Sequence, residues 1–80
     1  MNTRGSLPPL KLAALLSLVR GPLTFIPDVG WRSEYTRQVF NSHTAWYVRF
    51  RGWAQLSKDG AQLLPTKAAL EAAAALTEAA

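Results

Sequence analysis

Basic side chains are concentrated between residues 31 and 58 of the sequence. This stretch holds five arginines and lysines against a single acidic residue, Glu34, and it also contains most of the aromatic residues. Guanidinium groups bind phosphates and form two parallel hydrogen bonds with the edge of a guanine base. The pattern therefore indicates a negatively charged partner. A net charge of +4 for the whole chain is compatible with a nucleic acid, an anionic membrane surface or an acidic protein.

Few other residues are of types that carry out chemistry. The chain has no cysteine and one histidine, His43, which excludes thiol nucleophiles, disulfides and metal sites with several Cys or His ligands. We expect His43 to be a capping or partly buried polar group. The carboxylates have no paired spacing for acid–base work; they are Asp28, Glu34, Asp59, Glu71 and Glu78. There is no glycine-rich phosphate loop either, so the sequence predicts no cofactor and no enzymatic activity.

The length and composition predict one small globular domain. The chain has 80 residues, of which 49% are hydrophobic and 18% are charged, and this is too apolar for a disordered chain. We expect a loose tail over residues 1–7 and a single domain over residues 8–80. The most apolar run, residues 10–19, includes Lys11 and has about half of the roughly 20 residues that a membrane span needs. It predicts an amphipathic helix, no membrane partner and a cytoplasmic location.

The first elements follow from apolar spacing and from proline. Large apolar residues recur at helical spacing after Pro8 and Pro9, which suit a first helical turn, and Gly21 and Pro22 end the run. A helix is therefore predicted over residues 9–20. Residues 23–26 form a candidate strand, which the prolines on either side keep short.

Residues 31–53 fit two kinds of periodicity. Residues 46–51 alternate as a half-buried strand does. A helical stripe with spacings of three and four is formed by Tyr35, Val39, His43, Trp46, Phe50 and Trp53. Because Asn41 and Ser42 compete for backbone hydrogen bonds and Ser42 can cap a helix, we predict two helices, over residues 32–40 and 43–51, joined by a tight turn. The choice between helix and strand stays open for residues 44–51.

The aromatic residues of the helical stripe are expected in the core. Trp46, Phe50 and Trp53 lie at helical spacing, and a small domain needs the area that each ring buries. A stacking platform for single-stranded nucleic acid would instead require several exposed rings among basic residues.

Residues 53–64 have the pattern of a β-hairpin. Asp59 and Gly60 lie between two short segments, and glycine accepts the positive φ that a tight turn requires. Thr66 can then cap a helix, and the alanine-rich residues 67–78 have the highest helix propensity. We predict a C-terminal helix over residues 67–78 whose small side chains pack closely on a neighbour.

The order helix, strand, helix, turn, helix, hairpin, helix resembles the winged helix-turn-helix family of DNA-binding domains, most of all over residues 47–70. In that family a recognition helix ends in a glycine followed by an apolar residue, and a hairpin with Asp-Gly at its tip leads into another helix. Comparable places are occupied here by Gly52, Trp53, Asp59, Gly60, Leu64 and Thr66. The resemblance implies an α+β fold with a three-helix core, a β-hairpin wing and a C-terminal helix.

The resemblance also implies binding to double-stranded DNA by a transcriptional regulator. The helix over residues 43–51 would enter the major groove, where Arg49 or Arg51 would read guanine. Lys58 at the wing tip would reach a phosphate or the minor groove, and the arginines of the preceding helix would face the DNA backbone. The expected DNA-binding residues are Arg32, Arg37, Thr44, Tyr47, Arg49, Arg51 and Lys58. The small size also suits a protein encoded by a phage or another mobile element.

Two alternatives stay open at this point. In the first alternative, the basic residues between positions 31 and 58 bind no partner and only keep the surface of a small domain solvated. The chain is equally compatible with a protein-interaction module, an adaptor or inhibitor of a larger enzyme, because a fold does not determine a function. For the DNA-binding protein we also expect a homodimer formed through the terminal helices, because the small side chains of the alanine-rich C-terminal helix suit packing against a second copy.

Overall fold

The computed structural model describes residues 8–79 of the chain, with eight elements. The tail predicted over residues 1–7 lies outside the described residues. The elements are α1 (Pro9–Leu18), β1 (Leu23–Ile26), β2 (Gly30–Ser33), β3 (Val39–Phe40), α2 (Ser42–Phe50), β4 (Ala54–Leu56), β5 (Gln62–Pro65) and α3 (Lys67–Ala79).

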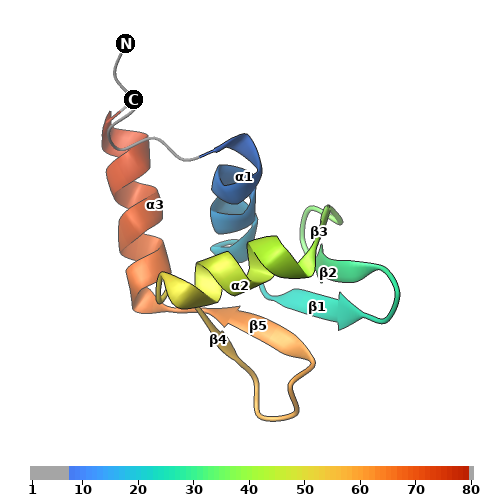
Figure 1. Cartoon of the computed structure of the whole chain (residues 1–80). Coiled ribbons are helices and arrows are strands. Elements are labelled where there is room, and N and C mark those ends of the chain that lie inside the picture. The colour runs from blue at the N-terminus through green and yellow to red at the C-terminus, as the bar shows by residue number, and fades with distance from the viewer. Residues whose placement is uncertain (1–7, 80) are drawn as a thin grey trace.

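The strands form one antiparallel sheet in the order β3-β2-β1-β5-β4. Figure 1 shows α2 crossing above β1 and β5, with α1 packed on α2 and α3 in contact with α1 at one end of the molecule. An antiparallel sheet with helices packed against it is an α+β architecture, so the predicted fold class is confirmed at that level.

The core lies between the helices and the sheet. Leu15 and Leu18 of α1, Val48 of α2 and Leu63 of β5 are fully buried there. Among the residues whose burial the structure describes, the buried apolar ones are Ala14, Leu15, Leu18, Leu23, Phe40, Ala45, Val48, Trp53, Ala54, Leu63, Ala69 and Ala73. They come from all three helices and from the sheet, so they form one core shared by both layers.

The helix predicted over residues 32–40 is wrong. This part of the chain forms β2, a loop and β3, in which Trp31 pairs with Phe40 and Arg32 pairs with Val39. β2 also pairs along its full length with β1. The three-helix core that the winged-helix resemblance implies therefore lacks its middle helix.

Two tight turns explain why a strand hairpin forms here. Asp28 and Gly30 have φ values of 65° and 133°, and a Cβ at position 30 would lie 2.6 Å from the carbonyl oxygen of Phe40. Only glycine allows the two strands to come this close. In the second turn, the Ser33 hydroxyl accepts a hydrogen bond from the backbone N–H of Thr36 at 3.0 Å.

The remaining predicted elements are present. The predicted helix over residues 9–20 is α1, the strand over 23–26 is β1, the hairpin is β4–β5, and the C-terminal helix is α3. The question left open for residues 44–51 is answered by α2, a helix of residues 42–50.

No helix in residues 8–79 has the length and apolar run needed to cross a membrane. The cytoplasmic location stays a prediction.

Candidate functional site

Helix α2 is fixed at both ends by its own sequence. At the start, Asn41 Oδ1 accepts a hydrogen bond from the Thr44 N–H at 2.8 Å, so Asn41 and not Ser42 caps the helix. At the end, the N–H of Trp53 donates to the carbonyl of Val48 at 2.9 Å, and Gly52 lies in the left-handed region at φ 79°. This is the Schellman arrangement, which terminates α2 and turns the chain directly into β4.

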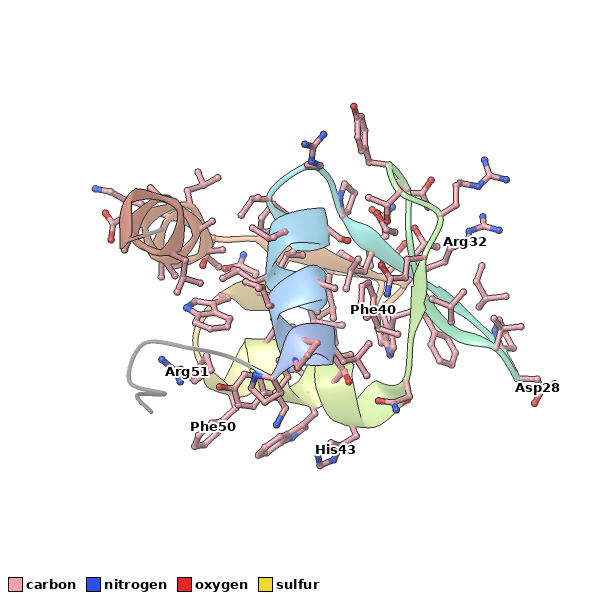
Figure 2. The ribbon with its side chains drawn as sticks, turned by 90° about the horizontal axis from the view of Figure 1, so that it is seen from above. Asp28, Arg32, Phe40, His43, Phe50 and Arg51 are labelled. Carbon is pink, nitrogen blue, oxygen red and sulfur yellow. The ribbon has the colours of Figure 1, made fainter. Side chains whose placement is uncertain are left out.

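The face of α2 that carries Trp46 and Phe50 is exposed. The two rings stack on one another with centroids 5.1 Å apart and planes 13° apart, and their side chains are 58% and 70% exposed. Figure 2 shows Phe50 and His43 pointing away from the body of the molecule along the outer side of α2. The expectation that Trp46 and Phe50 are core residues is therefore wrong, whereas Trp53, at 5% exposure, is in the core as expected.

The buried side of α2 is the opposite one, and it is lined by small residues. Thr44, Ala45 and Val48 are buried, because they face α1 and the sheet. Thr44 was expected to contact DNA, and with 2% exposure it cannot do so. His43 is exposed and is not the capping or partly buried group that the sequence predicted.

Three adjoining hollows run along α2, and we call them together the α2 groove. The first, of about 390 Å³, is lined by Trp46, Arg49, Phe50, Ala54, Gln55 and Leu56. The second, of about 210 Å³, is lined by Phe25, Trp31, Ser42, Ala45, Trp46 and Arg49. The third, of about 310 Å³, is lined by Phe25, Asp28, Val29, Gly30, Asn41 and Ser42. Neighbouring hollows share two residues each, so the groove extends from β4 to the β1–β2 turn.

The walls of the groove are mostly apolar. Phe25 and Trp31 pack against each other with ring centroids 5.1 Å apart, and Phe25 is 41% exposed. Val29 at the β1–β2 turn and Leu56 on β4 are exposed as well. Contiguous exposed apolar side chains on one face of a small domain are typical of interaction sites.

Arg49 is the charged residue at the centre of the groove. It lines both the first and the second hollow, and its side chain is exposed. No carboxylate pairs with Arg49 among the described side chains, and residues 35–58 contain no aspartate or glutamate. The groove therefore presents a cation without a partner inside an apolar surface.

A second basic cluster lies between α2 and α1. The Nζ atom of Lys11 lies 4.3 Å from the centre of the Tyr47 ring, and the Arg51 guanidinium lies 4.8 Å from that of Trp53. Arg51 Nη1 also donates a hydrogen bond to the Tyr47 hydroxyl at 3.1 Å. These contacts hold Arg51 against the aromatic rings, and they leave Tyr47 half-buried.

Arg32 and Arg37 lie apart from this cluster. Arg32 is on β2, where it alternates with Trp31 and so faces the side of the sheet away from α2 (Figure 2). Its Nε atom is buried and has no hydrogen-bond partner. Arg37 sits in the β2–β3 turn with φ 68°. The sequence analysis placed both residues on a helix over residues 32–40, and this is wrong. Neither residue joins the other candidate DNA-binding residues.

Lys58 is exposed at the tip of the β4–β5 hairpin, where the sequence placed it. The tip is held by Asp59, whose Oδ1 accepts hydrogen bonds from the Ser57 hydroxyl at 2.6 Å and the Ala61 N–H at 3.0 Å. These two hydrogen bonds, that of Ser57 foremost, hold the pKa of Asp59 below its ordinary value of 3.8. The next residue, Gly60, supplies the positive φ of the turn, at 74°.

The terminal helices pack against each other within the chain. Ala69 and Ala73 of α3 are buried, and α3 contacts α1. Leu10 and Leu16 of α1 and Leu70 of α3 are exposed. Part of the surface expected to form a homodimer is thus used inside one chain, and the homodimer stays a prediction.

The sequence analysis also missed the groove. Its residues come from β1, β2, α2 and β4, and no local pattern brings these segments together.

Comparison of the chain with protein-family models, with curated proteins and with solved structures finds no match.

Proposed function

We propose that this chain is a protein-binding module whose α2 groove holds an apolar segment that carries a carboxylate. The observation that carries the proposal is the stacked pair Trp46–Phe50, exposed at the wall of the groove next to the unpaired Arg49. Tryptophan, phenylalanine and arginine are enriched in the cores of protein interfaces, where they contribute most of the binding free energy.

The apolar side chains supply the driving force for binding. Fully burying one phenylalanine-sized side chain contributes roughly 1.5–3 kcal/mol. Trp46, Phe50 and Leu56 line the first hollow, Phe25 lines the second together with Trp46, and all four are at least 39% exposed. A partner that covers this surface therefore gains free energy from several rings at once.

Arg49 supplies selectivity for the partner. Covering the groove with a purely apolar segment would bury a guanidinium without an ion pair, which is costly. A carboxylate at the matching position removes that cost and adds a charge-assisted hydrogen bond. The basic residues around the groove would also speed encounter with an acidic partner.

Selection from a library of linear peptides displayed on phage tests this function with the intact chain as bait. Selected peptides are expected to combine apolar residues with aspartate or glutamate. Trp46→Ala and Arg49→Gln should each weaken binding of the best selected peptide by about tenfold or more, which corresponds to about 1.4 kcal/mol. The matched controls are Leu70→Ala, exposed on α3, and Arg32→Gln, on the other side of the sheet; both should bind as the parent chain does.

Two results would show that the groove is not the binding site. In the first, no peptide is enriched; in the second, the selected peptides bind the Trp46→Ala variant as well as the parent chain. Circular dichroism and urea unfolding of each variant separate a loss of binding from a loss of the fold.

Double-stranded DNA is the second candidate partner, and a specific arrangement favours it. β5 pairs with both β1 and β4, and α2 directly precedes this hairpin, which is the relation of recognition helix to wing that the winged-helix resemblance implies. Arg49 and Lys58 are exposed on these two elements. We rank DNA second because the outer face of α2 carries two large aromatic rings where a helix in the major groove carries polar side chains.

A further inference from the structure

Within residues 8–79, the outer edge of β4 has no paired strand. Among these residues β4 pairs with β5 alone, through Ala54 with Pro65, Gln55 with Leu64 and Leu56 with Leu63. Just outside the strand, the N–H of Ser57 donates to the carbonyl of Gln62 at 2.8 Å, and the N–H of Thr66 donates to that of Trp53 at 3.0 Å.

These two hydrogen bonds determine which backbone groups of β4 face outward. In an antiparallel pair, directly opposed residues alternate between hydrogen-bonded and non-hydrogen-bonded pairs. Because positions 53 and 57 are bonded to β5, position 55 is bonded too, and the N–H and C=O groups of Ala54 and Leu56 point away from β5. The proline opposite Ala54 fits this register, since Pro65 has no N–H to donate.

The free edge borders the α2 groove. Ala54, Gln55 and Leu56 line the same hollow as Trp46, Arg49 and Phe50. Ala54 is only 6% exposed, so the open part of this edge is the N–H and C=O of Leu56, which is 39% exposed. These groups border an apolar hollow that is also lined by an arginine without an ion pair. Addition of an extended peptide to a sheet edge uses these two features: backbone hydrogen bonds supply affinity, and pockets for alternate side chains supply specificity.

We propose that the partner segment binds as an added strand along β4, with every second side chain directed into the α2 groove and one of these being a carboxylate that pairs with Arg49. This inference rests on the proposed protein-binding function and specifies how the segment binds. The bound residues opposite Ala54 and Leu56 point to the α2 side, because opposed residues in a sheet share a face. The residue between them, opposite Gln55, points to the other face of the sheet.

Amide hydrogen exchange tests the added strand directly, with the best peptide from the phage selection as the probe. In the free chain the amide of Leu56, which is 39% exposed, should exchange quickly and that of Gln55 slowly, because only the Gln55 amide is bonded to β5. Saturation with the peptide should slow exchange at Leu56 by about tenfold or more, and the Gln55 amide serves as the internal reference.

A pair of variants at one position gives an independent test. Leu56→Pro removes the outward N–H while leaving the ladder to β5 intact, and Leu56→Ala removes the same side chain but keeps the N–H. An added strand predicts that Leu56→Pro weakens peptide binding by about tenfold more than Leu56→Ala does. The Gln55 and Leu64 amides report in the same exchange experiment whether the β4–β5 ladder has survived the substitution.

The possible results separate this inference from the function on which it rests. Binding that depends on Trp46 but leaves the Leu56 amide unchanged, with the two Leu56 variants equal, would show that the partner docks as a helix or by side chains alone. The groove would then remain the binding site, and the added strand would be overturned. Failure to select any peptide that depends on Trp46 would overturn both.

Discussion

The ring of Phe50 stacks on the ring of Trp46 one helical turn away, and most of both side chains is open to solvent. Removing either ring should therefore change stability far less than removing a core residue. We expect Trp46→Ala and Phe50→Ala each to cost roughly 0.5–1.5 kcal/mol, the range for an aromatic pair. Leu63→Ala, at a fully buried position, should cost about 2–5 kcal/mol. Urea unfolding of the three variants measures this, and a cost at Trp46 similar to that at Leu63 would contradict the exposed placement of the pair.

Asn41, not its neighbour Ser42, should carry the cap of α2. Asn41→Ala removes the acceptor of the Thr44 N–H and is expected to lower the free energy of unfolding by about 1 kcal/mol. Ser42→Ala is the matched control and should be close to neutral. Thermal unfolding of the two variants compares them directly, and equal losses would argue against the observed cap.

Gly52 should resist substitution because of its backbone conformation alone. No atom lies within 4 Å of the position that a Cβ would take, yet its φ is +79°. Gly52→Ala is therefore expected to cost roughly 1–2 kcal/mol, the penalty for placing a side chain in the left-handed region. Gly21 has the same open surroundings without a positive φ, so Gly21→Ala should be neutral or slightly stabilising. Comparing the free energies of unfolding of Gly52→Ala and Gly21→Ala by chemical denaturation isolates the cost of the left-handed backbone conformation.

Asp59 should make the hairpin sensitive to acid. Its pKa is depressed in the folded chain, mainly by the Ser57 hydroxyl and then by the Ala61 N–H. A depressed carboxylate pKa stabilises the fold above the unfolded value of 3.8, and this contribution is lost as the pH falls through the folded pKa. Ser57→Ala should raise the Asp59 pKa toward 3.8. Carboxyl chemical shifts followed by NMR over the acid range measure both values, and a pKa at or above 3.8 in the parent chain would refute the hydrogen-bonded tip.

If duplex DNA is the partner instead, binding should depend on the basic residues of α2 and the hairpin. Arg49→Ala combined with Arg51→Ala should weaken binding to random duplex DNA without a large change in melting temperature. Lys58→Ala should reduce the dependence of log K on log salt by about one. Fluorescence anisotropy between about 50 and 200 mM salt measures both effects. Affinity unchanged in the double variant would remove α2 from any DNA site.

The elements that the sequence predicted are those with strong local signals. Proline at the start of α1, the Asp59–Gly60 turn and the alanine-rich α3 act within a few residues of chain, so they are visible without the fold. The segment 31–40 was mispredicted because its structure depends on β1: Trp31 finds its partner in Phe25, and the helical spacing of Tyr35 and Val39 had no structural counterpart.

The candidate site was predictable only in part. Exposed Arg49 and Lys58 followed from charge and from the helix and hairpin that carry them. Burial of Thr44 and exposure of Trp46 did not, because α1 and the sheet select the side of α2 with small residues for close packing. The α2 groove could not be predicted from the sequence, because it forms only when strands that are distant in sequence lie beside the helix.

The hydrogen bond from the N–H of Trp53 to the carbonyl of Val48 joins the last turn of α2 to the residue directly before β4. The two sides of the groove are thus held in register by a short, internally bonded connection and by a buried indole. Such a cleft is preorganised: an incoming chain loses its own conformational freedom, while the receptor has little left to lose. Affinity should then depend chiefly on how rigid the free peptide is, so cyclised or proline-flanked peptides should bind more tightly than flexible peptides of the same composition.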